Sequence, residues 1–220
     1  GLKVHKNAFW FRDSVLNATR CVACSGHFWY FYMGQGVFNR SSIVVVNCTG
    51  ESRSGSMFSM LSQTGGSAIV HAFFVIRRSW FATLATSQSI VSHLGLETMV
   101  GTNVSVVIES SQLYAWARRD DAIPSSIRLK FASGSIGATL LIRGSTIWCL
   151  RGDQFDLNAP ARACVDLSPS PGMGNAVPFV MSLTIDDSYV QTIATAGTPP
   201  YATTAQVVAY ANPPYSHNET

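Results

Sequence analysis

Short runs of β-branched and aromatic residues, separated by clusters of turn-forming residues, recur along the whole chain. Residues 42–48 read Ser-Ile-Val-Val-Val-Asn-Cys, and residues 68–77 hold a second apolar run. In 103–109 and 126–131 apolar and polar residues alternate, which places every second side chain on one face of a strand. About eight strands are expected in all, the others lying at 138–143, 145–151, 178–185 and 203–210. This density of strands and turns predicts an all-β sandwich or barrel.

Helical periodicity is weak, and only two segments are candidates for a helix. In 13–24 Asp13 offers an N-cap, and in 87–99 several apolar residues fall near one helical face. Residues 50–66, rich in Ser, Gly and Met, show little periodicity and predict a loop.

A cluster of Pro and Gly at 169–174 predicts an interruption near the C-terminal end of the chain. It suggests a main β domain over residues 1–157 and a C-terminal β-rich extension over residues 158–220. No internal repeat is apparent in the sequence.

Charged residues are scarce. They make up 12% of the chain, against about 25% in an ordinary soluble domain, whereas hydrophobic residues make up 47%. So few charges are expected where neighbouring molecules cover much of the surface, because the centres of interfaces are depleted in charge. The net charge is +3, and no cluster of Lys and Arg is longer than a pair, which does not predict a nucleic-acid-binding surface.

No membrane span or secretory leader is expected from the sequence. The longest strongly apolar run, residues 68–76, is interrupted by His71 and is much shorter than the roughly 20 residues of a spanning helix. The basic residues near the start are followed by no long apolar stretch with a small-residue cleavage site. Because the first residue is Gly1 rather than Met, the sequence predicts cleavage from a precursor, either a polyprotein or a secreted protein that has lost its signal peptide.

The cysteines argue against a complete disulfide framework, because their number is odd. Free thiols are typical of a protein that assembles in a reducing cytosol. The five cysteines are Cys21, Cys24, Cys48, Cys149 and Cys164.

Two groups of residues were weighed as sites of metal binding or catalysis. Cys21, Cys24 and His27 are three potential zinc ligands, but a structural site needs four, and no second CxxC or HxxxH pair follows. Cys149 and Cys164 lack the flanking glycines that signal the oxyanion hole of a chymotrypsin-like cysteine protease. The sequence therefore predicts no enzyme, no metal and no cofactor.

Two further features keep a secreted binding module open as an alternative. The aromatic cluster at 28–32 is a candidate platform for sugars or bases, although its continuous apolar character favours a buried strand. Five glycosylation sequons are expected to be mostly chance, and Asn47 and Asn103 fall in or beside predicted strands, a poor position for a glycan. The sequons begin at Asn17, Asn39, Asn47, Asn103 and Asn218.

Several segments resemble the coat proteins of picornavirus-like viruses. Residues 29–47, with an aromatic pair, Met-Gly-Gln-Gly and a Val-rich run, resemble the strand C region, and residues 66–77 resemble strand D. Residues 100–116 are similar to strand F in the insect picorna-like viruses, of the dicistrovirus and iflavirus type. Residues 126–155 resemble the final hairpin, and 152–155 read Gly-Asp-Gln-Phe where that group often has Gly-Asp-Asp-Phe.

The chain departs from the family pattern at three points. The Arg of the Tyr-x-Arg-Gly element is Gln35 or is absent, the Pro of the Pro-Tyr turn is missing, and Gln154 replaces the second Asp of the last motif. In some relatives that Asp-Asp-Phe element is thought to promote cleavage of a coat precursor. With Gln154 in place, and Asp153 alone, this activity is not carried over.

The resemblance implies an eight-stranded antiparallel jelly-roll sandwich, with residues 158–220 as a projection or an intersubunit arm. It implies a structural capsid protein of a small icosahedral positive-strand RNA virus, assembled in the host cytoplasm and located in the virion. The implied partners are other capsid protein subunits in a pseudo-T=3 shell, genomic RNA on the inner face and an unidentified host receptor. The alternative function is a secreted β-sandwich module that binds carbohydrate.

Overall fold

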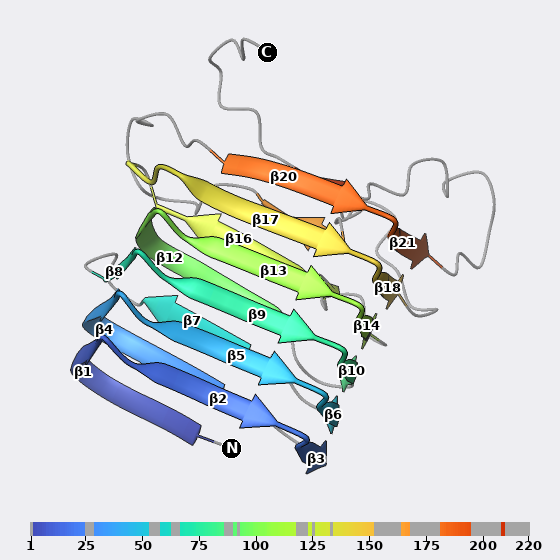
Figure 1. Ribbon diagram of the computed structural model, residues 1–220, viewed down its shortest axis with the longest axis horizontal. Coiled ribbons are helices and arrows are strands. Elements are labelled where there is room, and N and C mark those ends of the chain that lie inside the picture. Colours follow the sequence, from blue (N-terminus) through green and yellow to red (C-terminus); the bar gives the residue numbers. More distant parts are fainter. Residues whose placement is uncertain are drawn as a thin grey trace, which may run out of the picture.

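The chain winds into a parallel β-solenoid, in which successive coils contribute strands to each of three long sheets (Figure 1). A small two-stranded sheet pairs β11 (Ile90–Val91) with β15 (Ile123–Pro124). The structure is a computed structural model, and it describes residues 2–24, 29–52, 58–62, 67–85, 90–91, 93–117, 123–124, 126–132, 134–151, 164–167, 181–194 and 208–209.

The three long sheets are named A, B and C in the order in which the chain visits them. Sheet A contains β1 (Leu2–Arg12), β4 (Trp29–Asn39), β7 (Phe58–Ser62), β8 (Ala68–Val70), β12 (Leu94–Thr102), β16 (Ile127–Phe131), β19 (Val165–Asp166) and β22 (Val208–Ala209). Sheet B contains β2 (Val15–Thr19), β5 (Ser42–Val46), β9 (Phe73–Arg77), β13 (Ser105–Glu109), β17 (Ala138–Arg143) and β20 (Met181–Asp186). Sheet C contains β3 (Val22–Cys24), β6 (Thr49–Ser52), β10 (Trp80–Ala85), β14 (Gln112–Ala117), β18 (Thr146–Arg151) and β21 (Tyr189–Ala194).

The expected antiparallel jelly roll is wrong, because every pairing among the described strands is parallel. Residues 68–77, which were expected as one strand, show the physical reason. The chain bends at His71, where φ is 49°, so β8 joins sheet A and β9 joins sheet B. Consecutive strands therefore diverge onto different faces and cannot fold back on each other as a hairpin. Each strand pairs instead with the equivalent strand of the next coil.

Between sheets B and C, each coil turns at one residue with a positive φ. The angle ranges from 43° at Asp187 to 55° at Arg20. At Gly144 φ is 54°, and this glycine forms the corner between β17 and β18. Because the turn occupies so few residues, sheets B and C meet at a sharp edge, and the other residues at this edge are Asn47, Arg78 and Ser110.

A ladder of small side chains follows this corner along the solenoid. We call it the corner ladder; it consists of Cys21, Cys48, Ser79, Ser111, Ser145 and Ser188. Each serine hydroxyl donates to the carbonyl oxygen two residues earlier, at 2.7–2.8 Å. Each also accepts the backbone N–H of the ladder residue one coil earlier, at 3.1–3.2 Å. The bonded ladder residues are 27 to 43 positions apart, so the chain has a structural repeat of variable length where none is apparent in the sequence.

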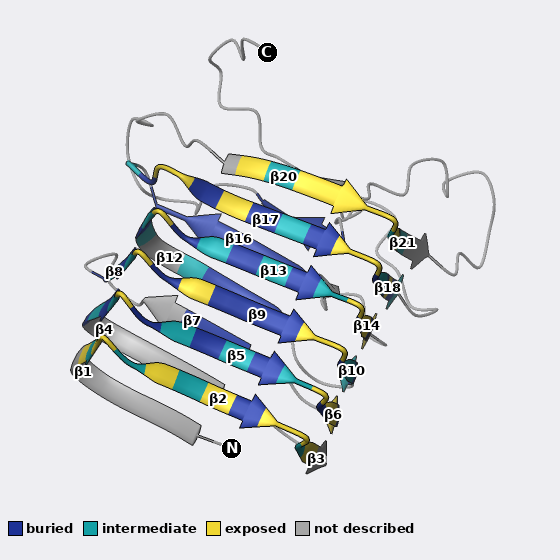
Figure 2. Cartoon of the chain, viewed as in Figure 1, coloured by how far each residue is buried: buried dark blue, intermediate teal, exposed yellow. Residues whose placement is uncertain are grey.

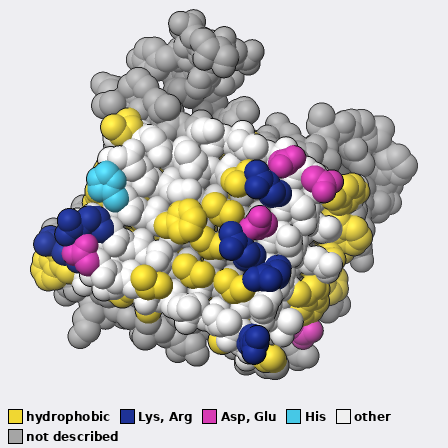
Figure 3. Space-filling model, in the orientation of Figure 1, with side chains coloured by type: hydrophobic (Ala, Val, Ile, Leu, Met, Phe, Trp, Pro, Cys, Tyr) yellow, Lys and Arg dark blue, Asp and Glu magenta, His cyan; other side chains and the backbone are white. Residues whose placement is uncertain are grey.

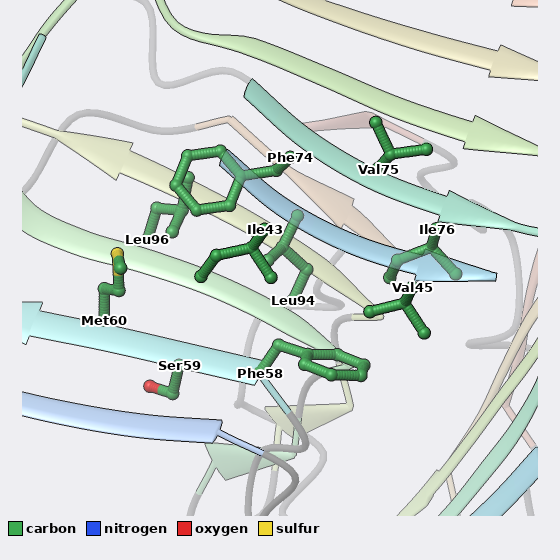
Figure 4. A pocket seen from close by; sticks show the side chains of 10 residues that line it. All are labelled: Ile43, Val45, Phe58, Ser59, Met60, Phe74, Val75, Ile76, Leu94 and Leu96. Carbon is green, nitrogen blue, oxygen red and sulfur yellow. The ribbon is translucent and has the colours of Figure 1, made fainter. Parts of the chain in front are cut away.

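Inward-facing side chains of the three sheets fill a continuous apolar core, and buried and exposed positions alternate along sheet B (Figure 2). The predicted alternation in 103–109 is confirmed, since Val104, Val106 and Ile108 are at most 1% exposed. A cavity of about 10 Å³ remains among side chains of β5, β7, β9 and β12, nearly all of them apolar (Figure 4). It is too small and too dry to serve as a ligand site.

The two segments expected as helices are strands. Residues 13–24 contain β2 and β3, and residues 87–99 contain β11 and the start of β12. The loop expected at 50–66 includes most of β6 and all of β7. In the part of the chain that the structure describes, no helix is long and apolar enough to cross a bilayer. The domain boundary at residue 157 stays a prediction; beyond it, β20 pairs with β17 and β21 with β18.

A buried disulfide joins Cys149 on β18 to Cys164, which directly precedes β19; the two Cα atoms are 5.4 Å apart. The expectation of scattered free thiols is therefore wrong for this pair. Cys21 and Cys48 are free thiols, and both belong to the corner ladder. Burial raises the pKa of the Cys48 thiol, so this sulfur is a neutral member of the ladder.

Candidate functional site

Four aromatic side chains follow one another across neighbouring strands on the outer face of sheet C. We call Trp80, Tyr114, Trp148 and Tyr189 the aromatic arc; they lie on β10, β14, β18 and β21. In each strand a residue adjacent to the aromatic one packs into the core, so alternation turns the aromatic side chain outward. Trp148 and Tyr189 are 40% and 51% exposed, which leaves much of their ring surface open to solvent.

Successive rings of the arc contact each other. The ring centroids of Trp80 and Tyr114 are 6.2 Å apart, those of Tyr114 and Trp148 are 5.5 Å apart, and those of Trp148 and Tyr189 are 6.3 Å apart. The second pair is edge-to-face, with an interplanar angle of 90°. Such pairs stabilise each other by about 0.5–1.5 kcal/mol beyond simple burial, so the rings hold one another in fixed orientations.

Polar side chains lie inside the curve of the arc. Trp80 and Tyr189 occupy the first positions of their strands, and the register places Gln112 and Thr146 between them in the same row. Tyr114 and Trp148 lie in the next row and pair with each other across β14 and β18.

Amide groups are built into the arc. The Tyr114 hydroxyl donates to Oε1 of Gln112 at 3.2 Å, and the Tyr189 hydroxyl donates to Oε1 of Gln191 at 2.6 Å. Each glutamine therefore has its carbonyl oxygen engaged, which turns its amide N–H groups toward other acceptors. Aromatic rings with amide donors beside them can meet both the apolar and the hydroxyl-bearing faces of one ligand.

The corner ladder fixes the position of every strand in this face. Ser79, Ser111, Ser145 and Ser188 directly precede β10, β14, β18 and β21, and the first three are at most 4% exposed. Behind the arc, Phe81, Leu113 and Ile147 are fully buried. The arc thus stands on a packed support, so a ligand would not have to order it on binding.

The charge of this face restricts the ligand class. Among the outward-facing residues of sheet C whose side chains the structure describes, none is Lys or Arg, and the single acidic one is Glu51 on β6. Arg20 and Arg78 lie at the corner instead. Nucleic acids and anionic polymers require cations that neutralise them, so the arc fits an uncharged ligand.

Sheet B presents a different surface (Figure 3). Hydrophobic side chains lie near its centre, with basic and acidic side chains beside them. Arg77 Nε is 2.6 Å from Glu109 Oε2, and Arg143 Nε is 3.1 Å from Asp186 Oδ2. These exposed pairs neutralise each other along neighbouring strands and contribute little to stability. Phe73 on β9 also lies on this face, and 44% of its surface is exposed.

A charged cluster on sheet A is buried rather than available to a ligand. Arg128 and Lys130 were expected on the face of their strand opposite the apolar residues, and both are at most 9% exposed. Arg128 Nη1 is 3.2 Å from Glu97 Oε1, and Lys130 Nζ is 3.1 Å from Asp166 Oδ2. Because each charge has an opposite charge beside it, the cluster is a structural element of the fold.

The residues weighed from the sequence do not form a site. Cys21 belongs to the corner ladder, whereas the side chain of Cys24 and all of His27 lie outside the described residues. Cys149 and Cys164 are joined in the disulfide, so neither is a nucleophile. No group of three or more His, Cys, Asp or Glu among the described residues is arranged to hold a metal. Of the aromatic cluster at 28–32, residues 29–32 belong to β4, and its side chains lie outside the described residues.

The sequence reading missed the aromatic arc, although a local signal for it exists. Trp80 and Tyr189 each follow a corner residue and a serine directly, and Tyr114 and Trp148 come three residues after a ladder serine. Each of the four aromatic residues follows a corner residue and a ladder serine, one or three positions after the serine. A search of the sequence for this pattern would have found the arc.

Comparisons with protein-family models, with curated proteins and with solved structures found no match to this chain. The resemblance to picorna-like coat proteins stays a hypothesis from the sequence.

Proposed function

We propose that this chain is a carbohydrate-binding protein that holds a neutral glycan against the aromatic arc. The observation that carries the proposal is the arc itself, which encloses Gln112 and Thr146 on a packed sheet with no described Lys or Arg on its outer face. The CH-rich face of a sugar ring packs well against an aromatic ring, while its hydroxyl groups need amide and hydroxyl partners. Carbohydrate was also the ligand of the alternative function predicted from the sequence. That prediction used the aromatic cluster at 28–32 and a β-sandwich, whereas the present proposal uses the aromatic arc of a solenoid.

The proposal is tested by binding of the purified chain to a panel of soluble neutral polysaccharides, followed by titration calorimetry with the best ligand. Trp148→Ala removes the most central exposed ring, and the Kd should rise at least tenfold, because a hot-spot aromatic residue contributes about 2 kcal/mol or more. Phe73→Ala is the matched control, since Phe73 has nearly the same exposure on sheet B. Its Kd should be unchanged.

Two outcomes would contradict the proposal. One is that the chain binds none of the neutral polysaccharides although a cooperative thermal unfolding transition shows that it is folded. The other is equal loss of affinity in Trp148→Ala and Phe73→Ala, which would place the binding elsewhere. Tyr114→Phe keeps the ring and removes the hydroxyl that orients Gln112. An intermediate loss in this variant would support a direct role for the amide.

A capsid function, expected from the resemblance, stays a proposal without a structural argument, because the jelly roll on which it depended is wrong. Assembly with other capsid subunits, contact with genomic RNA and location in the virion depend on the same premise.

A further inference from the structure

The structure separates the described sequons into two kinds. Asn17 lies on the outer face of β2 and is exposed, and Asn47 and Asn103 are exposed residues at corners, with φ of 53° and 51°. The sequence placed Asn47 and Asn103 in or beside strands. At these corners, however, both residues are exposed, so a bulky glycan on either of them would meet solvent. Asn218 lies outside the described residues.

Asn39 differs from these three. It is half-buried, and its Oδ1 atom is buried without a hydrogen-bond partner among the described residues. The hydroxyl of its sequon residue Ser41 is also buried; it donates to the Asn39 carbonyl at 2.8 Å and accepts the N–H of Ser14 at 3.1 Å. By contrast, Thr19 and Thr49, the hydroxyl residues of two other sequons, are exposed. A glycan on Asn39 would have to pull this amide out of the surface.

The side-chain amides of Asn17 and Asn103 make contacts that glycosylation of Nδ2 would preserve. Thr19 Oγ1 donates to Asn17 Oδ1 at 3.0 Å, which leaves Nδ2 pointing away. Nδ2 of Asn103 lies 3.4 Å from Nδ1 of His71 on the neighbouring coil. A glycosylated asparagine keeps one N–H, so Asn103 can keep this contact.

The disulfide supplies an independent observation about the compartment. Cys149 and Cys164 are both fully buried, so the folded core includes the S–S bond. Disulfides form and persist in oxidising compartments such as the secretory pathway, where N-linked glycans are also added.

We propose that Asn17, Asn47 and Asn103 are N-glycosylation sites of a chain that matures in an oxidising secretory compartment, and that Asn39 is not modified. The donor is an oligosaccharide linked to a lipid pyrophosphate. A bond forms between the sugar C1 and Asn Nδ2, the bond from C1 to the phosphate oxygen breaks, the lipid pyrophosphate leaves, and one amide proton passes to a base of the transferase. None of the four residues of the aromatic arc belongs to a sequon, so the modification and the glycan-binding proposal stand or fall separately.

The experiment is secretion of the full chain from insect cells behind a cleavable leader, followed by peptide mapping. A glycosidase that converts the modified Asn to Asp in ¹⁸O water marks each occupied site by mass. We expect marks at Asn17, Asn47 and Asn103, an unmarked Asn39, and the disulfide-linked peptide of Cys149 and Cys164 in the unreduced digest. Three results would overturn the proposal. They are the absence of marks at all three sites, an equal occupancy at Asn39, and recovery of the protein only in reduced form inside the cell.

Matched variants control for effects on folding. Thr19→Ala, Thr49→Ala and Ser105→Ala each destroy one sequon without changing the asparagine at the corner or on the strand. Each variant should lose the mass of one glycan and keep its secreted yield, and the triple variant should lose the mass of all three glycans. Persistence of full glycan mass in the triple variant would place the glycans elsewhere and refute the assignment.

Discussion

The corner ladder predicts a large cost for removing a single hydroxyl, and Ser111→Ala tests it. Ser111 is 1% exposed. Its hydroxyl donates to the Glu109 carbonyl at 2.8 Å and accepts the Ser79 N–H at 3.2 Å. The alanine variant loses both bonds, whereas the backbone N–H of residue 111 keeps its bond to Ser145 Oγ at 3.1 Å.

The two lost bonds have unequal consequences. The Glu109 carbonyl still accepts the N–H of Arg78 at 2.9 Å, so this loss costs only the net value of one hydrogen bond, about 0.5–1.5 kcal/mol. The Ser79 N–H, by contrast, becomes a buried donor without a partner, at a cost of about 1–3 kcal/mol. The sum is about 1.5–4.5 kcal/mol, above the roughly 1 kcal/mol on which the costs of point mutations centre.

Urea denaturation followed by circular dichroism measures this cost. With a slope of roughly 1–3 kcal/mol per molar urea, the midpoint of Ser111→Ala should fall by about 1 M or more. Ser111→Cys should recover part of the loss, because Cys48 already fills the same ladder position and its sulfur accepts the Cys21 N–H at 3.3 Å. Ser105→Ala, which loses one exposed hydrogen bond on sheet B, is the control and should shift the midpoint little. Equal shifts in Ser105→Ala and Ser111→Ala would refute the role given to the ladder.

Two further predictions concern the buried disulfide and a buried histidine. Replacing Cys149 and Cys164 together by Ala opens a link between residues 15 positions apart, and it should cost about 3 kcal/mol in the same urea assay; no difference between oxidised and reduced parent protein would contradict this. Burial lowers the pKa of His93 to about 3, opposed more weakly by backbone groups of Phe81 and Tyr114. The unfolded chain therefore binds a proton below pH 6.5 that the folded chain does not, so stability is full above pH 6.5 and falls by about 1.4 kcal/mol per pH unit toward pH 3. In His93→Gln this slope should be absent, and an unchanged slope would assign it to other groups.

Each of the eight segments expected as strands contains at least part of a strand of the solenoid, but the sequence missed others, among them β2, β10 and β21. In several of the expected segments it also identified the core face. Val104, Val106 and Ile108 are buried as the alternation predicted, and so are Ile127 and Leu129. This succeeds because inward burial leaves a period of two in a single strand, whatever its neighbours are. The same local rule failed at 13–24, where the corner at Arg20 between β2 and β3 interrupts the alternation and imitates helical spacing. It also failed at 87–99, which contains β11 and the start of β12.

The pairing of strands could not be predicted in this way, because a strand pattern records which side is buried and not which strand lies beside it. That choice is made by the corners. Arg78 with Ser79 and Gly144 with Ser145 direct the chain into the next sheet, but each pair resembles an ordinary turn in the sequence.

The repeat was hidden for a related reason, and this reason also bears on the candidate site. The five-residue β2, β5, β9 and β13 and their corners have constant lengths, because each ladder bond requires its strands to stay in register. The spacing of 27 to 43 residues therefore varies elsewhere in the coil, both between sheet C and the next strand of sheet A and between sheet A and sheet B. Extra residues are inserted after the strands that carry the aromatic arc, where no ladder bond restrains them. A solenoid built this way can change what surrounds the arc while it keeps the spacing of the arc itself.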